Sequence, residues 1–286
     1  MDRPQMQTVG TSQGTASDRF RDLIRSLTGI NLPPGKVPMI EQRLRRRVLA
    51  HELPDTEAYL RKLLEGALKE DELRIVIDLI TTNTTSFFRE SDHFTYLRDH
   101  ILPEHLTKSA PNRARLKVWS AASSEGAEAF TIAMVLAEAQ RSGRAFDWAV
   151  LGTDISIRIL EKAQSAVYDV DQLQTVPSDL ARRYFLYSDD PALARKARVI
   201  PDLRRRVQFR RLNLMDKTYP VDRDVNVIFL RNVLIYFDAN DKAGVIKRMH
   251  EHLSPGGYLI VGHAESMVVR CEGLVQIRPT IFRRVN

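Results

Sequence analysis

From residue 116 onward, short apolar runs alternate with amphipathic helical segments, and this alternation restricts the fold more than any other feature of the sequence. Segments such as FTIAMVLAEAQ and AGVIKRMHEHL have the helical pattern. Strands that alternate with helices predict an α/β fold built on a doubly wound sheet. The apolar runs are LKVWSAA (116–122), AVLGTDI (149–155), VQFRRLNL (207–214), VNVIFLRN (225–232) and GYLIVGHA (257–264).

Two departures from this alternation predict additional structure within a domain that spans residues 115–286. Between Tyr168 and Arg206 the spacing is too long for one crossover helix, so we expect an inserted subdomain at about 168–206. Two closing runs, 274–277 and 280–284, flank Pro279 and predict a hairpin at the edge of the sheet.

The first part of the chain has a different pattern. Apolar residues recur every three or four positions between Phe20 and Phe88, which predicts a small helical domain over residues 17–90. Residues 1–16 are rich in Gln, Thr, Ser and Gly and lack this periodicity, so they are expected to be a disordered lead-in. A further helix at 93–105 is predicted within a linker of residues 91–114.

Composition narrows the classes of function. The chain has no run of about 18 apolar residues and no apolar stretch near its N-terminus, which predicts a cytoplasmic protein without membrane insertion. The single cysteine, Cys271, cannot form an internal disulfide bond and is interpreted as structural. A net charge of +7 favours an acidic partner, although charge alone does not separate nucleic acid, an anionic membrane and an acidic protein.

Residues that follow the predicted strands are the candidates for ligand binding, because ligands of doubly wound sheets bind beyond the carboxyl ends of the strands. After the first strand, small residues over 120–128 allow a ligand to approach the backbone. The second strand ends in Asp154, whose carboxylate can accept hydrogen bonds from both ribose hydroxyls. Both features also occur as ordinary turns, and the segment lacks the G-x-G-x-x-G pattern of dinucleotide sites.

Five segments carry a resemblance to a known family. They are TTNTTSFFRE (81–90), VWSAASSEGAE (118–128), GTDIS (152–156), FLRNVLIYFD (229–238) and GGYLIVGHAES (256–266). In order and spacing they resemble the motifs of the CheR-type chemotaxis protein-glutamate O-methyltransferases, from about residue 18 to the C-terminus. The resemblance implies a class I methyltransferase domain that depends on S-adenosylmethionine (SAM), an N-terminal all-α domain and an inserted small β-subdomain.

The resemblance also implies roles for individual residues, with SAM as cofactor, S-adenosylhomocysteine as product and no metal. Glu128 and Asp154 are implied to bind the methionyl and ribose parts of the cofactor. Arg89 and Tyr236 are implied catalytic residues, and Tyr236 is expected to face the reacting methyl group. The remaining implied cofactor contacts are Asn83, Thr85 and Arg89 from the segment before the sheet, and Asn213, Leu214, Arg231 and Asn232 from the sheet.

A basic helix over 39–51 is the implied docking surface for the substrate. Arg43, Arg46 and Arg47 are spaced at i, i+3 and i+4, which makes them neighbours on a helix surface. The implied partners are methyl-accepting chemoreceptors, whose cytoplasmic domains are acidic helical bundles, and the enzyme is expected to act as a monomer. A charge run of this kind also occurs on an ordinary solvated helix face.

The chain departs from the family pattern in two places. Many relatives have Gly-Glu-Glu-Pro-Tyr where this chain has Gly-Ala-Glu-Ala-Phe at 126–130, which predicts an effect on cofactor affinity or specificity. Some relatives bind a receptor tether through a β-subdomain whose Tyr-Phe pair precedes a glycine-containing loop. Here Tyr184 and Phe185 precede LYSDDPALARKARV, which has no glycine, and this favours action without a tether.

Two alternatives remain open from the sequence. One is a module that binds SAM and docks on receptors with weak or no turnover. The other is a nucleic-acid methyltransferase, which the basic pI of 9.6 favours, although the usual [D/N/S]-P-P-[Y/F] motif is replaced by RNVL at 231–234. A metal site is not expected, because the spacing of His93, His100 and His105 does not bring them together and no carboxylate completes a set of metal ligands. These histidines are predicted to be surface or capping residues, and His263 a packed one.

Overall fold

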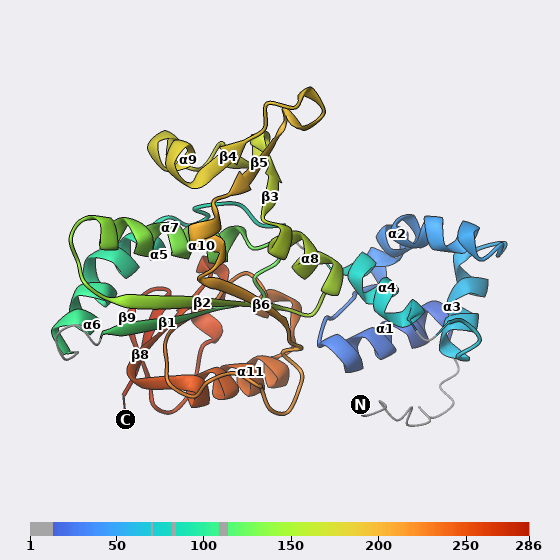
Figure 1. Cartoon of the computed structure of the whole chain (residues 1–286). Coiled ribbons are helices and arrows are strands. Elements are labelled where there is room, and N and C mark those ends of the chain that lie inside the picture. The colour runs from blue at the N-terminus through green and yellow to red at the C-terminus, as the bar shows by residue number, and fades with distance from the viewer. Residues whose placement is uncertain (1–13, 70, 82–83, 109–113, 286) are drawn as a thin grey trace. The chain divides into compact units, whose positions relative to one another are not determined.

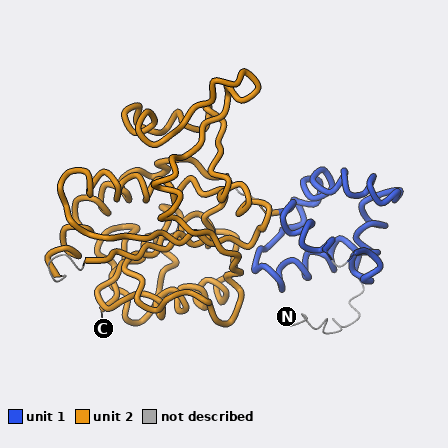
Figure 2. Tube along the Cα trace, viewed as in Figure 1, with its two compact units in different colours: residues 1–80 blue, residues 81–286 orange. Residues whose placement is uncertain are grey.

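The computed structural model describes residues 14–69, 71–81, 84–108 and 114–285. Within these residues the chain folds into two compact units, the first ending at Ile80 and the second beginning at Thr81 (Figure 2). The first unit therefore ends ten residues before residue 90, where the helical domain was predicted to end. The predicted linker, residues 91–114, belongs to the second unit. Most of the predicted lead-in, residues 1–13, falls outside the described residues.

The first unit is all-α, as the spacing of its apolar residues predicts. Thr15 caps the first helix in a capping box with Asp18, whose side chain accepts from the Thr15 backbone N–H. The apolar faces of the helices meet in one core that includes Phe20, Leu44 and Tyr59, all buried. The helices are α1 (Ala16–Thr28), the 3₁₀ turn η1 (Pro34–Lys36), α2 (Val37–Ala50), α3 (Thr56–Leu64) and α4 (Glu72–Ile80).

A buried carboxylate joins three helices of this unit. Glu72, on α4, is 2% exposed. Its carboxylate accepts from Arg47 Nε of α2 at 2.8 Å and from the hydroxyl of Tyr59 of α3 at 2.5 Å. His51 Nε2 lies 3.2 Å from the same carboxylate. Although burial alone would raise the pKa of Glu72, the Arg47, Tyr59 and His51 contacts lower it to about 2.

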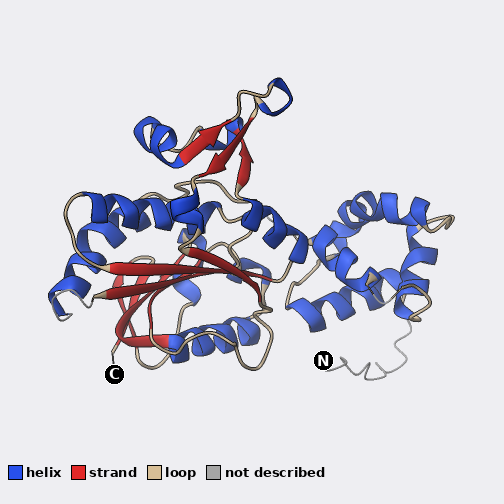
Figure 3. Cartoon of the chain, in the orientation of Figure 1, coloured by secondary structure: helices blue, strands red, loops and turns tan. Residues whose placement is uncertain are grey.

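The second unit is built on a seven-stranded sheet with the order β6-β2-β1-β7-β8-β10-β9. The pairs from β6 to β8 are parallel, whereas β10 is antiparallel to both β8 and β9. Figure 3 draws the strands in red. The last two strands form the predicted edge hairpin. The strands are β1 (Arg115–Ala121), β2 (Asp147–Asp154), β6 (Val207–Arg211), β7 (Val225–Leu230), β8 (Leu253–Val261), β9 (Leu274–Arg278) and β10 (Ile281–Arg284).

Helices cover both faces of this sheet, which confirms the predicted α/β class. Figure 1 shows α5, α7 and α8 on one face and α11 on the other. The run of α5, η2 and α6 extends from Asp92 to Lys108 and contributes Phe94 and Leu97 to the sheet core. The helices are α5 (Asp92–Tyr96), the π-helical turn η2 (Leu97–Ile101), α6 (Leu102–Lys108), α7 (Ala127–Arg141), α8 (Ile157–Ser165) and α11 (Ala239–His252).

A second, three-stranded antiparallel sheet of order β3-β5-β4 is inserted between α8 and β6. It projects from the main sheet in Figure 1. The predicted small β-subdomain is therefore present. Its elements are β3 (Val167–Asp169), η3 (Val170–Leu173), α9 (Ser178–Tyr184), β4 (Phe185–Tyr187), η4 (Pro191–Leu193), β5 (Lys196–Val199) and α10 (Pro201–Arg204).

The topology fixes where a ligand can bind. The chain runs from β1 outward to β2 and β6, then returns to the other side of β1 at β7. The strand order therefore reverses between β1 and β7, and the carboxyl ends of these strands form the crevice in which such folds bind ligands. Among the described residues, no helix is long and apolar enough to span a membrane.

The Glu72 cluster yields a prediction about the stability of the first unit. Glu72→Gln removes a carboxylate that the Arg47 guanidinium and the Tyr59 hydroxyl hold, and the free energy of unfolding should fall by about 2 kcal/mol at pH 7. The Arg47 side chain is 29% exposed, so water can partly solvate the orphaned guanidinium and limit the loss. Hydrogen exchange of the amides in 37–80 measures this unit by itself. Glu41→Gln, an exposed change on α2, should alter protection by less than about 0.5 kcal/mol.

The same cluster predicts a pH dependence. The pKa of Glu72 is lower in the folded protein than its ordinary value of 4.5, so its contribution is complete above pH 4.5. That contribution is lost as the pH falls from 4.5 towards about 2. The stability difference between wild type and Glu72→Gln should therefore shrink over this interval. A difference that stayed constant down to pH 2 would contradict the assignment.

Candidate functional site

The turn after β1 has a backbone that few side chains tolerate. Ala122 and Ser124 have φ values of 59° and 52°, and Gly126 has a φ of 88° just before α7. A Cβ atom at Gly126 would lie 2.8 Å from Phe209 Cζ, so this position needs glycine for space as well as for conformation. The small residues predicted to expose backbone to a ligand therefore form a sharp turn between β1 and α7.

Asp154 ends β2 and holds this turn. Its Oδ2 accepts from the Ser124 backbone N–H at 2.9 Å, and its Oδ1 accepts from the Ser156 backbone N–H at 3.0 Å. Only 6% of Asp154 is exposed. The carboxylate thus lies at the predicted position beyond the second strand, where it joins the β1 turn to the start of α8.

Arg231, the first residue after β7, is the centre of the charged contacts at the crevice. Its side chain is 2% exposed, and its Nη1 donates to Glu128 Oε2 at 2.9 Å. Its Nη2 donates to the backbone carbonyl of Arg89 and lies 3.2 Å from Glu90 Oε2. One buried guanidinium therefore joins the start of α7, the end of β7 and the segment before α5.

Glu128 is the first-turn carboxylate of α7 and also contacts β1, because Ser120 Oγ donates to its Oε1 at 2.7 Å. Burial raises the pKa of Glu128, while Arg231 and Ser120 act in the opposite direction. Burial likewise opposes ionisation of Glu90, but Arg231 and Asn232 outweigh it and lower the pKa of Glu90. Two carboxylates thus share one guanidinium in a largely desolvated place.

The backbone after β7 is held by a carboxylate that the sequence analysis missed. Glu265, in η6 (His263–Val268), is 1% exposed and lies three residues beyond Gly262. Its carboxylate accepts backbone N–H groups at 2.7 to 2.8 Å from Gly262 and from residues 232–234. Asn232 has a φ of 58° within this loop. The acidic residue in GHAES was the available signal, but only the fold shows which amides it binds.

The structure places further predicted site residues at the same edge of the sheet. Asn213 and Leu214 follow β6, the neighbour of β2, and Asn213 Oδ1 accepts from the Met215 backbone N–H at 3.0 Å. Tyr236 is half-buried in the 3₁₀ turn η5 (Leu234–Tyr236) after β7. Asn83 lies outside the described residues.

Arg89 differs from its neighbours in exposure. Its side chain is exposed, and Nη1 donates to the Thr84 carbonyl at 3.3 Å, while Thr85 is half-buried. The backbone is fixed on both sides, because Arg231 donates to the Arg89 carbonyl and Phe88 N–H donates to Thr131 Oγ1 at 3.2 Å. A fixed backbone thus presents an exposed guanidinium next to the crevice.

The expectation is wrong for two of the histidines, because the side chain of His263, which was expected to be packed, is 62% exposed. His93 is 2% exposed, so it is a buried residue rather than a surface or capping one. A carboxylate also completes a set around it, because Glu90, His93 and His263 bring potential ligand atoms within 4.8 Å of one another. The spacing within one helix could not show this, since His263 comes from the turn after β8.

The predicted docking arginines differ in environment. Arg46 is exposed on α2. Arg47 is bound to the buried Glu72, and Arg43 Nη1 donates to the carbonyl of Ile80 at 2.7 Å, so both take part in holding the helical unit together. Arg45, which was not singled out from the sequence, is also exposed.

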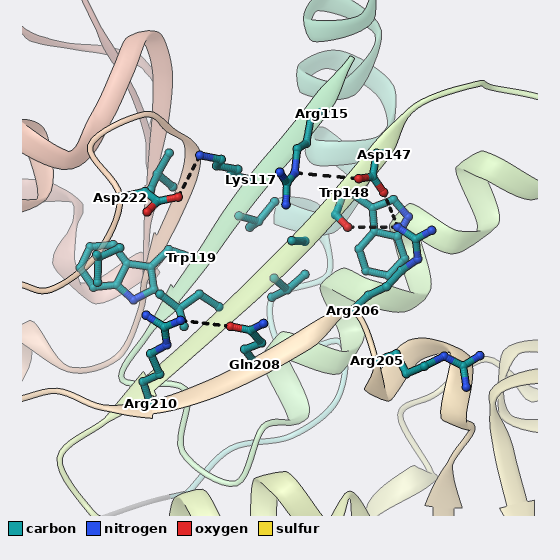
Figure 4. Close-up of a pocket in the computed structure, with 16 residues that line it drawn as sticks. Arg115, Lys117, Trp119, Asp147, Trp148, Arg205, Arg206, Gln208, Arg210 and Asp222 are labelled. Carbon is teal, nitrogen blue, oxygen red and sulfur yellow. Dashed lines mark hydrogen bonds and ion pairs between the residues drawn. The ribbon is translucent and has the colours of Figure 1, made fainter. Parts of the chain in front are cut away.

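A pocket of about 330 Å³ lies elsewhere on the main sheet, over β1, β2 and β6 (Figure 4). Arg115 and Asp147 are the first residues of β1 and β2, so the pocket reaches the amino ends of the strands rather than the crevice. Its basic side chains are largely paired, for example Lys117 with Asp222 at 2.8 Å and Arg206 with Asp147 at 2.6 Å. None of the predicted cofactor residues lines it.

The crevice fits a polar ligand that carries positive charge. Ser123 Oγ and Arg231 Nε are buried atoms without a hydrogen-bond partner among the described residues, as expected where a polar ligand completes the contacts. Two carboxylates, Asp154 and Glu128, lie at this edge beside the one buried guanidinium of Arg231. A sulfonium nucleoside with an ammonium group matches this surplus of negative charge.

Two family models match the chain, one for each of its compact units. The family described as "CheR methyltransferase, SAM binding domain" matches residues 83–280, and "CheR methyltransferase, all-alpha domain" matches residues 16–81. The first match covers the whole crevice, and the second covers the helical unit.

Curated relatives match over most of their length. A chemotaxis protein methyltransferase of Borreliella burgdorferi is 36% identical over 269 residues, which is 93% of this chain and 93% of that protein. The chemotaxis protein methyltransferases of Salmonella typhimurium and Escherichia coli are each 37% identical over 250 residues, covering 87% of this chain and 82% and 83% of theirs. The motifs, the fold and these matches agree, and the chain belongs to the CheR family of SAM-dependent chemotaxis methyltransferases.

Proposed function

We propose that this enzyme transfers the methyl group of SAM to glutamate side chains of chemoreceptor cytoplasmic domains, forming glutamyl methyl esters during adaptation in chemotaxis. The observation that carries the proposal is the contact of buried Arg231 with Glu128 and with the Arg89 carbonyl. This contact links the cofactor crevice to the exposed guanidinium of Arg89, which can bind a substrate carboxylate. The relatives' names as chemotaxis protein methyltransferases support the same substrate class.

The reaction requires little from the protein beyond the positioning of the cofactor and the substrate carboxylate. The sulfonium of SAM supplies a methyl group that is already activated for transfer. A glutamate side chain with a pKa near 4.3 is already ionised at neutral pH, so the attack needs no general base and no metal ion. The residues must therefore align the carboxylate oxygen with the methyl carbon and exclude water, because proximity and desolvation supply most of the rate.

Each site residue has a proposed part in this arrangement. Asp154 accepts hydrogen bonds from the ribose hydroxyls, and Glu128 pairs with the ammonium group of the methionyl part. Arg89 orients the substrate carboxylate, and Tyr236 lines the path of the methyl group. The pocket is completed by Asn83, Thr85, Asn213, Leu214, Arg231 and Asn232.

Receptor docking is proposed to use the exposed part of the basic helix α2. Arg46 and Arg45 can meet an acidic helical surface, whereas Arg47 is bound to Glu72 and contributes by holding α2 in place. Complementary charge mainly raises the association rate and weakens with salt. The enzyme is proposed to act in the cytoplasm as a monomer and without a tether.

The assignment of Asp154 predicts a loss of cofactor affinity. Asp154→Asn keeps one acceptor oxygen but removes the charge and the second acceptor, so the Kd for SAM should rise about 10- to 100-fold. Isothermal titration calorimetry measures this. Asp189→Asn, an exposed change in the β-subdomain, is the matched control and should leave the Kd unchanged. An unaltered Kd in Asp154→Asn would contradict the ribose assignment.

The identity of the acceptor is tested by supplying labelled SAM with receptor cytoplasmic fragments, DNA and RNA in parallel. Label on the receptor fragment that base treatment releases as methanol is the expected result, because methyl esters hydrolyse readily in base. Base-stable label on nucleic acid would replace this proposal with nucleic-acid methylation. Measurable SAM binding with no label on any acceptor would indicate a receptor-docking module instead.

The docking proposal predicts an effect confined to the encounter with the receptor. Arg46→Glu should raise the KM for receptor fragments about three- to tenfold at low salt and leave kcat nearly unchanged. The effect should diminish as salt is added. Arg19→Glu makes the same charge change at an exposed position of α1. An equal effect of Arg19→Glu would show that net charge alone, rather than α2, attracts the receptor.

A further inference from the structure

Three side chains converge beside the crevice, and the methyl transfer described above uses none of them. Glu90 precedes α5, His93 lies on α5, and His263 is the first residue of η6 after β8. Glu90 Oε2 lies 3.6 Å from His93 Nδ1 and 3.4 Å from His263 Nδ1. The two imidazole rings stack, with centroids 5.4 Å apart. Residues about 170 positions apart in the sequence therefore point nitrogen and oxygen atoms at one place.

The two separations from Glu90 Oε2 match those of ligands around one ion. Donors at 2.0 to 2.1 Å from a tetrahedral Zn²⁺ lie about 3.3 Å from one another, which is the edge of that tetrahedron. The contacts of Glu90 Oε2 to the two nitrogens are close to this length. They are longer than the 2.7 to 3.2 Å of an ordinary N–H···O hydrogen bond.

The hydrogen bonding of His93 leaves its Nδ1 without a protein partner. Nε2 lies 2.7 Å from Thr280 Oγ1. If Nε2 carries the proton and donates to Thr280, Nδ1 presents a bare lone pair to the Glu90 carboxylate. Both Nδ1 of His93 and Oε2 of Glu90 are buried and lack a hydrogen-bond partner among the described residues. A buried lone pair on Nδ1 without a donor is costly, and a cation between Nδ1 and Oε2 removes that cost.

Supporting contacts also resemble those of metal sites, in which the ligands are oriented by further hydrogen bonds. Thr280 holds the far nitrogen of His93, and Asn232 Nδ2 donates to Glu90 Oε1 at 3.2 Å, leaving Oε2 for the ion. The exposed His263 side chain gives an ion access from solvent.

Arg231 is the main opposing charge, because its guanidinium lies 3.2 Å from Glu90 Oε2. Glu128 pairs with Arg231 from the other side. The guanidinium therefore has a second carboxylate and does not leave an unbalanced positive charge beside the ligand atoms.

We infer that Glu90, His93 and His263 form a binding site for one divalent transition-metal ion of the Zn²⁺ type. Two imidazoles and one carboxylate are a common zinc ligand set, with a further position open to water. The ion ties the turn after β8 to the segment that ends in Arg89 and Glu90. The site adjoins the cofactor crevice through the contact of Glu90 with Arg231, and the inference does not depend on the substrate proposed above.

Metal binding to the full chain tests the inference without reference to activity. Metal-free protein is titrated with Zn²⁺ and dialysed, and the bound zinc is measured by elemental analysis. Wild type should retain one Zn²⁺ per chain and show a thermal midpoint a few degrees higher with Zn²⁺ than without. His263→Ala should bind Zn²⁺ at least tenfold more weakly and lose the thermal shift. Because His263 is exposed, this variant is expected to fold.

His100→Ala is the matched control, since His100 is an exposed histidine that stacks on Tyr96 outside the cluster. It should bind Zn²⁺ like wild type. Substitution with Co²⁺ gives a second measure, because nitrogen and oxygen ligands produce visible absorption without the thiolate band that Cys271 would add. Equal Zn²⁺ affinity in wild type and His263→Ala, or a cobalt–thiolate band, would overturn the inference. Equal weakening of Zn²⁺ binding by His100→Ala would also overturn the inference, because it would show that the binding is adventitious.

Discussion

The crevice of this enzyme depends on one buried guanidinium. Arg231 stands at the carboxyl end of β7, next to the reversal of strand order, and it contacts Glu128, Glu90 and the carbonyl of Arg89. A buried ion pair contributes little net stability, because desolvation offsets most of the Coulomb attraction. The ion pair instead fixes the positions of its partners, because removing one partner would leave an unpaired buried charge. The contacts therefore hold three chain segments in one arrangement.

Carboxylates elsewhere hold backbone in the same way. Glu265 accepts from a series of backbone amides after β7 and β8, and Asp154 accepts from the turns after β1 and β2. Each carboxylate satisfies amides that loops cannot pair within a strand or helix. The residues that form the crevice are thus fixed before a cofactor enters. Such preorganisation suits a reaction whose rate depends on alignment rather than on proton transfer.

In the first unit, the arginines that were predicted to dock the receptor have different environments. The spacing of Arg43, Arg46 and Arg47 made them neighbours on a helix, and all were expected to meet a receptor. The fold separates them, because α4 brings the buried Glu72 against Arg47 and its last carbonyls against Arg43. Helical spacing defines neighbours on one helix only. It contains no information about the acid that another helix presents.

The sequence by itself determined the α/β class, the helical first unit, the inserted β-subdomain and the family, because these depend on local periodicity and on motifs continuous in the chain. It also placed Asp154 and Arg231 at strand ends. Only the tertiary structure decided which atoms meet, such as Glu265 with the amides after β7 and His263 with Glu90 and His93. These contacts join segments up to about 170 residues apart. Local patterns cannot specify them, because their partners are set by strand order and helix packing.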